Sequence, residues 1–484
     1  MSSIDQQPAI PTYLLLANNL ERQIQGQLFH PGERLPSVRK VASGHRFSLE
    51  TVLHAFRTLE DRGLIEARPR SGYYVRQQHR LLEPSQTALK LEASPVHLTR
   101  LRHEAFILGN ARGVVPLSVA VPSPDVLPTR KLGQMLSVLA RKNGSEMIKY
   151  APLAGNANLR KQLARRARDW GCFAEPDDFI ITNGTAEALS LALQATCQPG
   201  SAVVVESPTY YGILELIGSL GLRVVELPAH PSEGIDLAAL RTVLDSVPKI
   251  GACLFVTNHS NPLGCTLPTR RKIELAEILT GRNIPLIEDD IYGDLNQPGM
   301  ERPPVVKSFD QNDLVLLCGS VSKIISPGLR VGWIHPGKFR QKVAGIKAAR
   351  TLASPSITQM AVAEFLEHGA YDSHLRRIRA FFAEQIIRFS AAIADYFPPE
   401  TKVSRPSGGF ALWIELPPEI DTVELARRAM NQHQIAIAPG CIFSASGARF
   451  GNCFRMSCGY PWSAKIESAV RTLGKLAWEL GAKA

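Results

Sequence analysis

Residues 319–333, GSVSKIISPGLRVGW, place a lysine in a loop rich in serine and glycine, directly after the apolar run DLVLLC. Arg330 follows Lys323 by seven residues. A lysine amine can form a Schiff base with an aldehyde cofactor, while hydroxyls, an arginine and backbone N–H groups can neutralise a phosphate. Taken alone, Lys323 is better explained as a surface lysine, since most lysines are solvated. The surrounding sequence decides between these interpretations.

Three other segments carry polar groups of a matching kind. IEDDIYGDL (287–295) ends an apolar strand with carboxylates, and an acid beneath a pyridine nitrogen keeps that nitrogen protonated. NHSNPLG (258–264) supplies an amide beside a proline turn, and TNGTAEAL (182–189) presents free N–H groups at a helix start. Each segment also has an ordinary explanation as a helix cap, a turn or a helix start. None of them is decisive alone.

From about residue 115, β-branched runs alternate with helical patterns. FIITN precedes AEALSLALQATC, SAVVVE precedes YGILELIGSLG, and ACLFVTN precedes TRRKIELAEILTGRN. Strands separated by crossover helices predict an α/β domain with a large, mainly parallel sheet. After about residue 345 the helices lengthen, and the late strands GFALWIEL and NCFRMSCGY predict a smaller α+β C-terminal subdomain.

The first 80 residues differ in texture and carry 11 Lys/Arg against 7 Asp/Glu. Apolar spacing predicts an amphipathic helix over 13–28, a short helix that begins near Pro36, and a third helix capped by Ser48 and ending near Gly63. LIEARPRSGYYV predicts a two-stranded wing. The spacing is that of a helix-turn-helix, although a small helical cap with a solvated arginine face explains it equally well.

Composition sets outer limits. At 484 residues and 45% hydrophobic content the chain holds about three compact units rather than one small module. The net charge of +11 is compatible with an anionic partner. Eight cysteines without a CxxC pair predict reduced core thiols, with neither a disulfide framework nor a metal site. MSSIDQQPAI resembles no signal peptide, and no apolar stretch approaches the about 18 residues of a spanning helix, so we expect a cytoplasmic protein without membrane contact.

The run from Pro31 to Val75 resembles, almost end to end, the winged helix-turn-helix of the GntR family of bacterial transcription factors. The resemblance implies double-stranded operator DNA as a partner. It also implies a set of DNA-binding residues: Arg34, Arg39, Ser48, Thr51, Arg70 and Gly72. One departure is that Leu49 and Glu50 stand where many relatives carry a basic or small polar residue, so the operator sequence does not transfer.

Seven motifs over roughly residues 100–484 resemble, in order, those of the fold-type I pyridoxal-phosphate aminotransferases. They are Tyr150 with Gly155, NGTAEA, SPTYYG, NPLG, EDDIYGD, SVSKIISPGLRVGW and FRMSCGY. The resemblance implies pyridoxal 5'-phosphate as the cofactor, with Lys323 as its Schiff-base anchor. Asp289 would pair with the pyridine nitrogen, and Asp290 is the weaker candidate because the family spacing places the acid three residues before the tyrosine.

The same resemblance implies roles for the other motif residues. Asn261 and Tyr292 would hydrogen-bond the ring hydroxyl, and Tyr210 would stack on the ring. The phosphate would be surrounded by Gly184, Thr185, Ala186, Ser320, Ser322 and Arg330. Tyr150 would reach the phosphate from the partner subunit of a homodimer. Arg455 would bind a substrate α-carboxylate, unless it is a structural arginine paired with a core carboxylate.

The two resemblances together are those of the MocR subfamily of bacterial regulators. We expect a DNA-binding domain over 10–78, a linker over 79–100 and an aminotransferase-like domain over 101–484, of which 345–484 is mostly the small subdomain. The leading hypothesis is a transcriptional regulator whose DNA binding responds to pyridoxal phosphate, a small amino compound, or both. A working aminotransferase with an accessory DNA-binding head stays open, because the site residues are intact. A DNA binder of the nucleoid type with a dead core would need a broken site.

Overall fold

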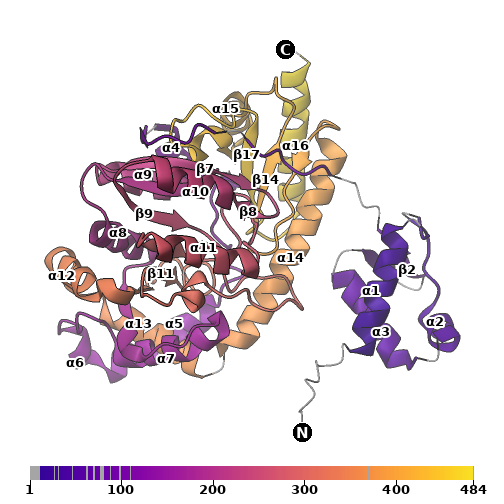
Figure 1. Cartoon of the computed structure of the whole chain (residues 1–484). Coiled ribbons are helices and arrows are strands. Elements are labelled where there is room, and N and C mark those ends of the chain that lie inside the picture. The colour runs from indigo at the N-terminus through magenta and orange to yellow at the C-terminus, as the bar shows by residue number, and fades with distance from the viewer. Residues whose placement is uncertain are drawn as a thin grey trace, which may run out of the picture. The chain divides into compact units, whose positions relative to one another are not determined.

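The computed structural model divides the chain into two units, residues 1–80 and 81–484, which are described separately (Figure 1). The described residues are 11–26, 28–30, 32–45, 47–61, 64–68, 71–76, 81–87, 89–97, 100–109, 111–368 and 370–482. Among them, no helix is both long and apolar enough to span a bilayer.

The first unit, here called the head, consists of three helices and a hairpin. Its elements are α1 (Thr12–Gln25), α2 (Val38–His45), α3 (Leu49–Asp61), β1 (Ile65–Arg68) and β2 (Gly72–Val75). β1 and β2 pair antiparallel, so the predicted wing is confirmed. α1 ends at Gln25, three residues before the predicted end, where Gly26 N donates to Arg22 O and closes the last turn.

The head has its own hydrophobic core. Val52, Phe56 and Leu59 of α3 are completely buried, as their spacing of three and four residues requires. The Phe56 ring meets the Tyr73 ring edge-on at 5.0 Å, which joins α3 to the wing. Ser48 caps α3 as predicted, because its Oγ accepts a hydrogen bond of 3.0 Å from Thr51 N.

A large mixed sheet forms the centre of the second unit. Five parallel strands make its core: β7 (Arg223–His230), β6 (Ala202–Ser207), β9 (Ile250–Phe255), β10 (Leu286–Asp289) and β11 (Val315–Ser320). The prediction of a parallel core is confirmed. Four strands extend this core. β12 (Gly332–His335) pairs antiparallel with β11, and β5 (Ile180–Thr182) pairs antiparallel with β12, so β5 runs in the same direction as the core strands; β3 (Ser94–Pro95) and β8 (Gly234–Ile235) pair antiparallel with β7.

The core strands are almost continuously apolar because helices connect them and cover the sheet. The connecting helices are α8 (Thr185–Thr196), α9 (Tyr211–Ser219), α10 (Leu237–Ser246) and α11 (Thr269–Gly281). Further helices are α4 (Arg100–Gly109), α5 (Thr129–Lys142), α6 (Gly144–Met147) and α7 (Ala157–Ala167). Single 3-10 turns lie at Arg168–Trp170, Pro176–Asp178, Val306–Phe309, Gly337–Phe339 and Gly440–Phe443.

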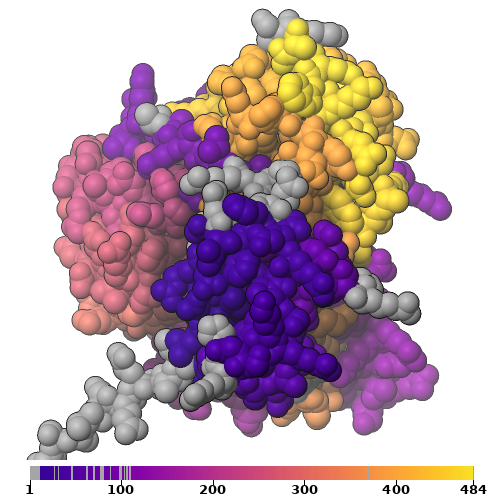
Figure 2. All heavy atoms as spheres, turned by 90° about the vertical axis from the view of Figure 1, so that its right-hand side faces the viewer, coloured from indigo at the N-terminus to yellow at the C-terminus, as the bar shows by residue number. Residues whose placement is uncertain are grey.

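The small subdomain has an antiparallel sheet. Its strands, in spatial order, are β13 (Lys402–Val403), β14 (Ala411–Glu415), β17 (Cys453–Ser457) and β16 (Ala438–Pro439). The two late strands of the sequence analysis are β14 and β17, which pair directly. Around the sheet lie α14 (Ala370–Tyr396), α15 (Thr422–His433) and α16 (Ala464–Gly481). Figure 2 shows these C-terminal segments, orange to yellow, gathered at the upper end of the unit.

The small subdomain begins later than residue 345. α12 (Arg340–Arg350) packs on α8, and α13 (Ser356–Glu367) packs on α5 and α7 (Figure 1). These partner helices share hydrophobic clusters with strands of the large sheet, so α12 and α13 are part of the large subdomain. The first α14 residue in the small core is Ile386, and this core also takes Val115 from β4 (Val115–Pro116), which pairs with β15 (Ile435–Ala436). The greater length of the helices after residue 345 therefore did not mark the start of the small subdomain. A helix belongs to the subdomain in which its apolar face is buried, whatever its length.

The segment predicted as a surface linker, 79–100, does lie at the surface in its described part, but it is bonded to the second unit. Residues 81–87 and 89–97, here called the strap, are fixed along the second unit. Val403 N donates to Leu82 O at 2.8 Å, and Ser85 N donates to a Glu415 carboxylate oxygen at 2.6 Å. β3, within the strap, adds a strand to the large sheet. A segment without hydrophobic periodicity can still be held through its backbone.

All eight cysteines are buried and free, as expected for core thiols.

We predict that Phe56→Ala destabilises the head alone. Loss of a completely buried phenylalanine typically costs about 3–5 kcal/mol. Chemical unfolding of the full chain should therefore show an earlier transition for the head and an unchanged transition for the second unit. Phe173→Ala is the control, because Phe173 is exposed. Equal shifts of both transitions would contradict the division into two independent cores.

Candidate functional site

The candidate site lies where three neighbouring parallel strands end. β9, β10 and β11 are adjacent in the sheet, so their carboxyl ends meet at one edge. Asn261 follows β9, Asp289 ends β10, and Ser320 ends β11. Ligands of open α/β sheets bind at this edge, because the loops there are free to carry polar side chains.

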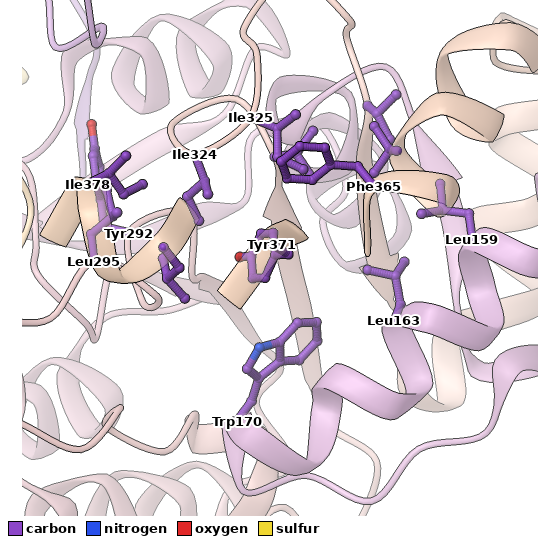
Figure 3. Close-up of a cluster of buried hydrophobic side chains, with 14 of the residues drawn as sticks. Leu159, Leu163, Trp170, Tyr292, Leu295, Ile324, Ile325, Phe365, Tyr371 and Ile378 are labelled. Atoms are coloured by element: carbon purple, nitrogen blue, oxygen red, sulfur yellow. The ribbon is translucent and has the colours of Figure 1, made fainter. Parts of the chain in front are cut away.

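The loop that carries Lys323 is fixed by its apolar neighbours. Ile325 N donates to Val321 O at 2.8 Å and closes a tight turn. Val321, Ile324 and Ile325 are buried in one hydrophobic cluster. Figure 3 shows Ile324 and Ile325 in this cluster near Tyr292 and Phe365. Burial of these side chains positions the lysine.

The Lys323 amine lies among charged groups of the site. Its Nζ donates to Ala120 O at 2.6 Å and lies 5.9 Å from the centroid of the Tyr292 ring. Burial lowers the pKa of Lys323 to about 8, and the positive charges of Arg455 and Arg330 act in the same direction against Asp289. A larger fraction of uncharged, nucleophilic amine is therefore present near neutral pH than in an exposed lysine.

Asp289 and Asp290 have different surroundings although they are adjacent. Asp290 accepts from Asn258 Nδ2 at 2.8 Å and forms an ion pair with Arg302. Asp289 accepts from the backbone N–H of Ile291 at 3.1 Å. Burial raises the pKa of Asp289 to about 7, and the neighbouring carboxylates of Asp290 and Glu288 act in the same direction. Asp289 is thus the carboxyl group that a cationic ligand atom would stabilise.

A hydrogen-bond chain joins three predicted residues. Asn261 Nδ2 donates to the Tyr292 hydroxyl at 3.4 Å, and Arg455 Nη1 donates to Asn261 Oδ1 at 3.0 Å. Asn261 and Tyr292 are buried. The chain of hydrogen bonds runs from Tyr292 after β10, through Asn261 after β9, to Arg455 on β17, so it connects the large sheet with the small subdomain.

Arg455 is 0% exposed. Its Nη2 donates to Ser118 O, while its Nε makes no hydrogen bond. In the described part of the chain no carboxylate forms an ion pair with Arg455, so the alternative of a structural arginine paired with a core carboxylate is not observed. A buried guanidinium with an open donor is suited to an incoming anion.

A second group of predicted residues gathers at the start of α8. Gly184 has φ +78°, and a Cβ there would lie 2.5 Å from Arg330 Nη2, so only glycine fits against this guanidinium. Arg330 Nη2 donates to Asn183 O at 2.9 Å. Thr185 Oγ1 is buried and makes no hydrogen bond. Ser320 and Ser322 are buried nearby, since Ser320 pairs with Gly332, which contacts Gly184.

These groups are of the kind that binds an anion. The first N–H groups of a helix, an arginine and three hydroxyls together provide the donors that a phosphate needs. Ala186 lies exposed in the first turn of α8. Tyr210 precedes α9, and a Cβ at Gly212 would lie 2.5 Å from its ring, so this glycine admits the ring. Tyr150 is 85% exposed and joins none of the hydrogen bonds described above.

Sequence reasoning missed a buried ionic network beneath the site. Arg302 pairs with Asp290 and with Asp294, whose Oδ1 lies 2.5 Å from Arg302 Nε. Lys272 is completely buried and donates to Asn258 Oδ1 at 2.5 Å. Asp290 and Asn258 stand within noted motifs, whereas Lys272 and Arg302 stand outside them, and no local pattern in the sequence marks these two.

The head presents its predicted residues separately. Arg34 and Arg39 are exposed, and the Arg34 guanidinium lies beside Gly72, which has φ +105°. Ser48 Oγ lies 2.8 Å from Thr51 Oγ1, so these hydroxyls bond to each other at the start of α3. Arg70 lies outside the described residues.

The fold and the site thus define a fold-type I aminotransferase-like domain that carries a winged helix-turn-helix. Residues 115–473 match the family described as aminotransferase class I and II, and residues 12–75 match the bacterial regulatory proteins of the gntR family. The crystal structure of LysN, an alpha-aminoadipate aminotransferase from Thermus thermophilus, has a TM-score of 0.73 at 28% identity, over 80% of this chain and 96% of that chain.

Two relatives share both parts. The uncharacterized HTH-type transcriptional regulators YjiR and YdcR of Escherichia coli (strain K12) are each 38% identical, over 465 and 478 residues. These matches cover 96% of this chain in both cases, and 98% and 99% of the relatives. The chain therefore belongs to the MocR subfamily of GntR-type transcriptional regulators, which joins this DNA-binding domain to an aminotransferase domain.

We predict opposite effects of amide substitution at the two adjacent aspartates. Asp289 has a folded pKa of about 7, above its unfolded value of about 3.9, so its contribution to stability is lost as the pH rises through 7. Asp289→Asn should therefore raise the free energy of unfolding of the cofactor-free protein by about 1–3 kcal/mol at pH 8, and by almost nothing near pH 4.

Asp290→Asn serves as the matched variant. It breaks a buried ion pair with Arg302 and should lower the free energy of unfolding by about 3 kcal/mol at pH 8. Urea unfolding of the second unit measures both effects. A stabilised Asp290→Asn beside a destabilised Asp289→Asn would exchange the roles of the two carboxylates.

Proposed function

We propose that the protein binds operator DNA through its head and that pyridoxal 5'-phosphate, together with a small amino compound, modulates this binding from the candidate site. The observation that carries the proposal is Arg455, a completely buried arginine whose Nε lacks a hydrogen bond and which is linked through Asn261 to Tyr292. A domain that only stored a cofactor would have no need of this second charged position.

The residues present fit pyridoxal phosphate. Lys323 would hold its aldehyde carbon, Asp289 its ring nitrogen, and Asn261 with Tyr292 its ring hydroxyl. Tyr210 would cover the ring face. The phosphate would be held by Gly184, Thr185, Ala186, Ser320, Ser322 and Arg330. When bound, the cofactor supplies an electron sink for chemistry on amines.

The chain's own residues would prepare the site for these groups. The lowered pKa of Lys323 keeps part of its amine uncharged, and a bound ring N–H⁺ would bring Asp289 into its ionised form. The unpartnered hydroxyl of Thr185 is a donor that an anion would satisfy. Arg455 would bind a carboxylate of the amino compound through two parallel hydrogen bonds.

A homodimer completes the proposal. Tyr150 is 85% exposed, and the nearby Met147 and Ile148 are exposed apolar residues. Contact with a second copy would cover this surface and bring Tyr150 to the phosphate of the partner's site. Two heads on a two-fold dimer would read two half-sites of an operator. The setting for this function is the cytoplasm.

We predict that Arg39→Ala reduces the salt dependence of DNA binding. Each phosphate neutralised by a basic side chain adds about −0.9 to the slope of log K against log salt. Arg39 is exposed on α2, and its loss should lower the magnitude of the slope by about that amount for each head. Arg22→Ala on α1 is the control. Wild-type affinity and slope in Arg39→Ala would place this side chain away from the backbone of the DNA.

We predict that Arg455→Ala uncouples the amino compound from DNA. By linkage, operator DNA and the effector must change each other's affinity by the same factor, typically about 5- to 150-fold. Titrations of cofactor and candidate amino acids, with and without operator, should show this factor in the wild type and in Arg471→Ala, a surface control. In Arg455→Ala the factor should fall to about one. Arg455→Lys tests the bidentate geometry without removing the charge.

If pyridoxal phosphate alone produces the full coupling, and Arg455→Ala preserves it, the cofactor is itself the effector. A second candidate function is turnover as an aminotransferase, which is favoured by the joint presence of Lys323, Asp289 and Arg455 in one site. A multiple-turnover amino-transfer assay distinguishes a catalyst from a sensor that reacts once.

A further inference from the structure

Two leucines on the head are exposed where the helix-turn-helix meets DNA. Leu49 and Leu53 are the first and fifth residues of α3 and are 51% and 38% exposed. Single exposed leucines are common on protein surfaces. These two are four residues apart, so their side chains are neighbours on one side of the helix and are here called the apolar patch; Val52 and Phe56 of the same helix are buried.

The patch occupies the part of the motif that contacts bases. In a helix-turn-helix the second helix enters the major groove, and its N-terminal residues reach the base edges. α3 is that second helix. The N-terminal end of α3 therefore determines which base edges the head can recognise.

The polar side chains of these two turns offer few donors to bases. The hydroxyls of Ser48 and Thr51 bond to each other, and Ser48 Oγ also accepts from Thr51 N. The His54 ring stacks on Tyr13 of α1 at a centroid distance of 3.7 Å. The first basic side chain of α3 is Arg57, in its third turn. The surface left to contact bases consists mainly of leucine methyl groups.

Glu50 restricts this surface further. It is exposed beside Leu49, and its carboxylate would be repelled by a phosphate. The start of α3 therefore suits the floor of the groove, while Arg34 and Arg39, which are exposed outside α3, suit the DNA backbone. In the major groove, the only apolar group on a base edge is the 5-methyl group of thymine.

We infer that Leu49 and Leu53 recognise thymine 5-methyl groups, so that this head selects its operator largely by apolar contacts in the major groove. The inference rests on the DNA-binding part of the proposed function. It adds a source of base specificity, apolar contact with thymine, that does not depend on hydrogen-bond donors.

The test replaces thymine by deoxyuridine, which removes only the methyl group. Duplexes are first selected from a random library with the full-length wild-type protein, and each thymine of the selected site is then replaced singly. At one or more thymines in each half-site, wild-type affinity should fall about fourfold, as expected for the loss of one buried methyl group.

The leucine variants complete a double-mutant cycle. Leu49→Ala and Leu53→Ala should each bind the thymine duplex more weakly, and each should lose the difference between thymine and deoxyuridine at one position. Their salt slopes should equal that of the wild type, because no phosphate contact is lost. Leu15→Ala is the matched control: Leu15 is 52% exposed but lies on α1, and its removal should leave the thymine preference unchanged.

Four outcomes would overturn the inference. In the first, replacement of thymine by deoxyuridine leaves the affinity for the selected site unchanged. In the second, the loss of affinity persists in the Leu49→Ala, Leu53→Ala double variant. The leucine variants can also change the oligomeric state in sedimentation while keeping the thymine preference, which would make the patch a contact between copies. If the library yields no preferred sequence, the DNA-reading function fails and the inference fails with it.

Discussion

Five neighbouring parallel strands must all end at the same edge of their sheet, and the position of Asn261, Asp289, Ser320 and Lys323 depends on this constraint. The pleat adds a second level of sorting, because successive side chains of a strand point to opposite faces. At the end of β10, Glu288 and Asp290 enter a buried network with Thr257, Asn258 and Arg302. Asp289, between them, faces the other way, toward the region of Lys323. Three consecutive carboxylates thus acquire two different roles from strand geometry alone.

The site holds two buried charges of opposite sign that lack charged partners. They lower the stability of the ligand-free fold, and they favour ligands that carry the complementary charges. Ionised Asp289 has no cation in direct contact among the described residues, and Arg455 has no anion. Each charge costs free energy when it is buried alone. A cofactor with a cationic ring nitrogen and an amino compound with a carboxylate would satisfy the two positions together. Binding of both would stabilise the folded state by mass action, so occupancy of the site and stability would rise together.

Much of this arrangement could be predicted from the sequence, because several functional residues stand in short motifs whose spacing alone indicates their chemistry. Lys323 with its serines, Asp289 after an apolar run, and Ser48 before α3 are examples in which local spacing carries the information. The partners of Arg302 and Lys272 could not be predicted, since their pairing depends on where separate loops meet. The reversed direction of β12 was missed for a similar reason: its sequence is apolar like those of the core strands, and direction is not encoded by composition.

The strap shortens the segment that connects the head with the second unit. If residues 79–100 were free, the head would move on a tether of more than 20 residues and tolerate many operator spacings. Because the strap is bound from Leu81 onward and the described head ends at Arg76, only residues 77–80 separate the two. So short a connection leaves the head far less reach than the full linker would. The hydrogen bonds that hold the strap to β7 and Glu415 would therefore limit how far apart the two half-sites of an operator can lie. A preference for one spacer length between half-sites would then depend on the second unit and not on α3.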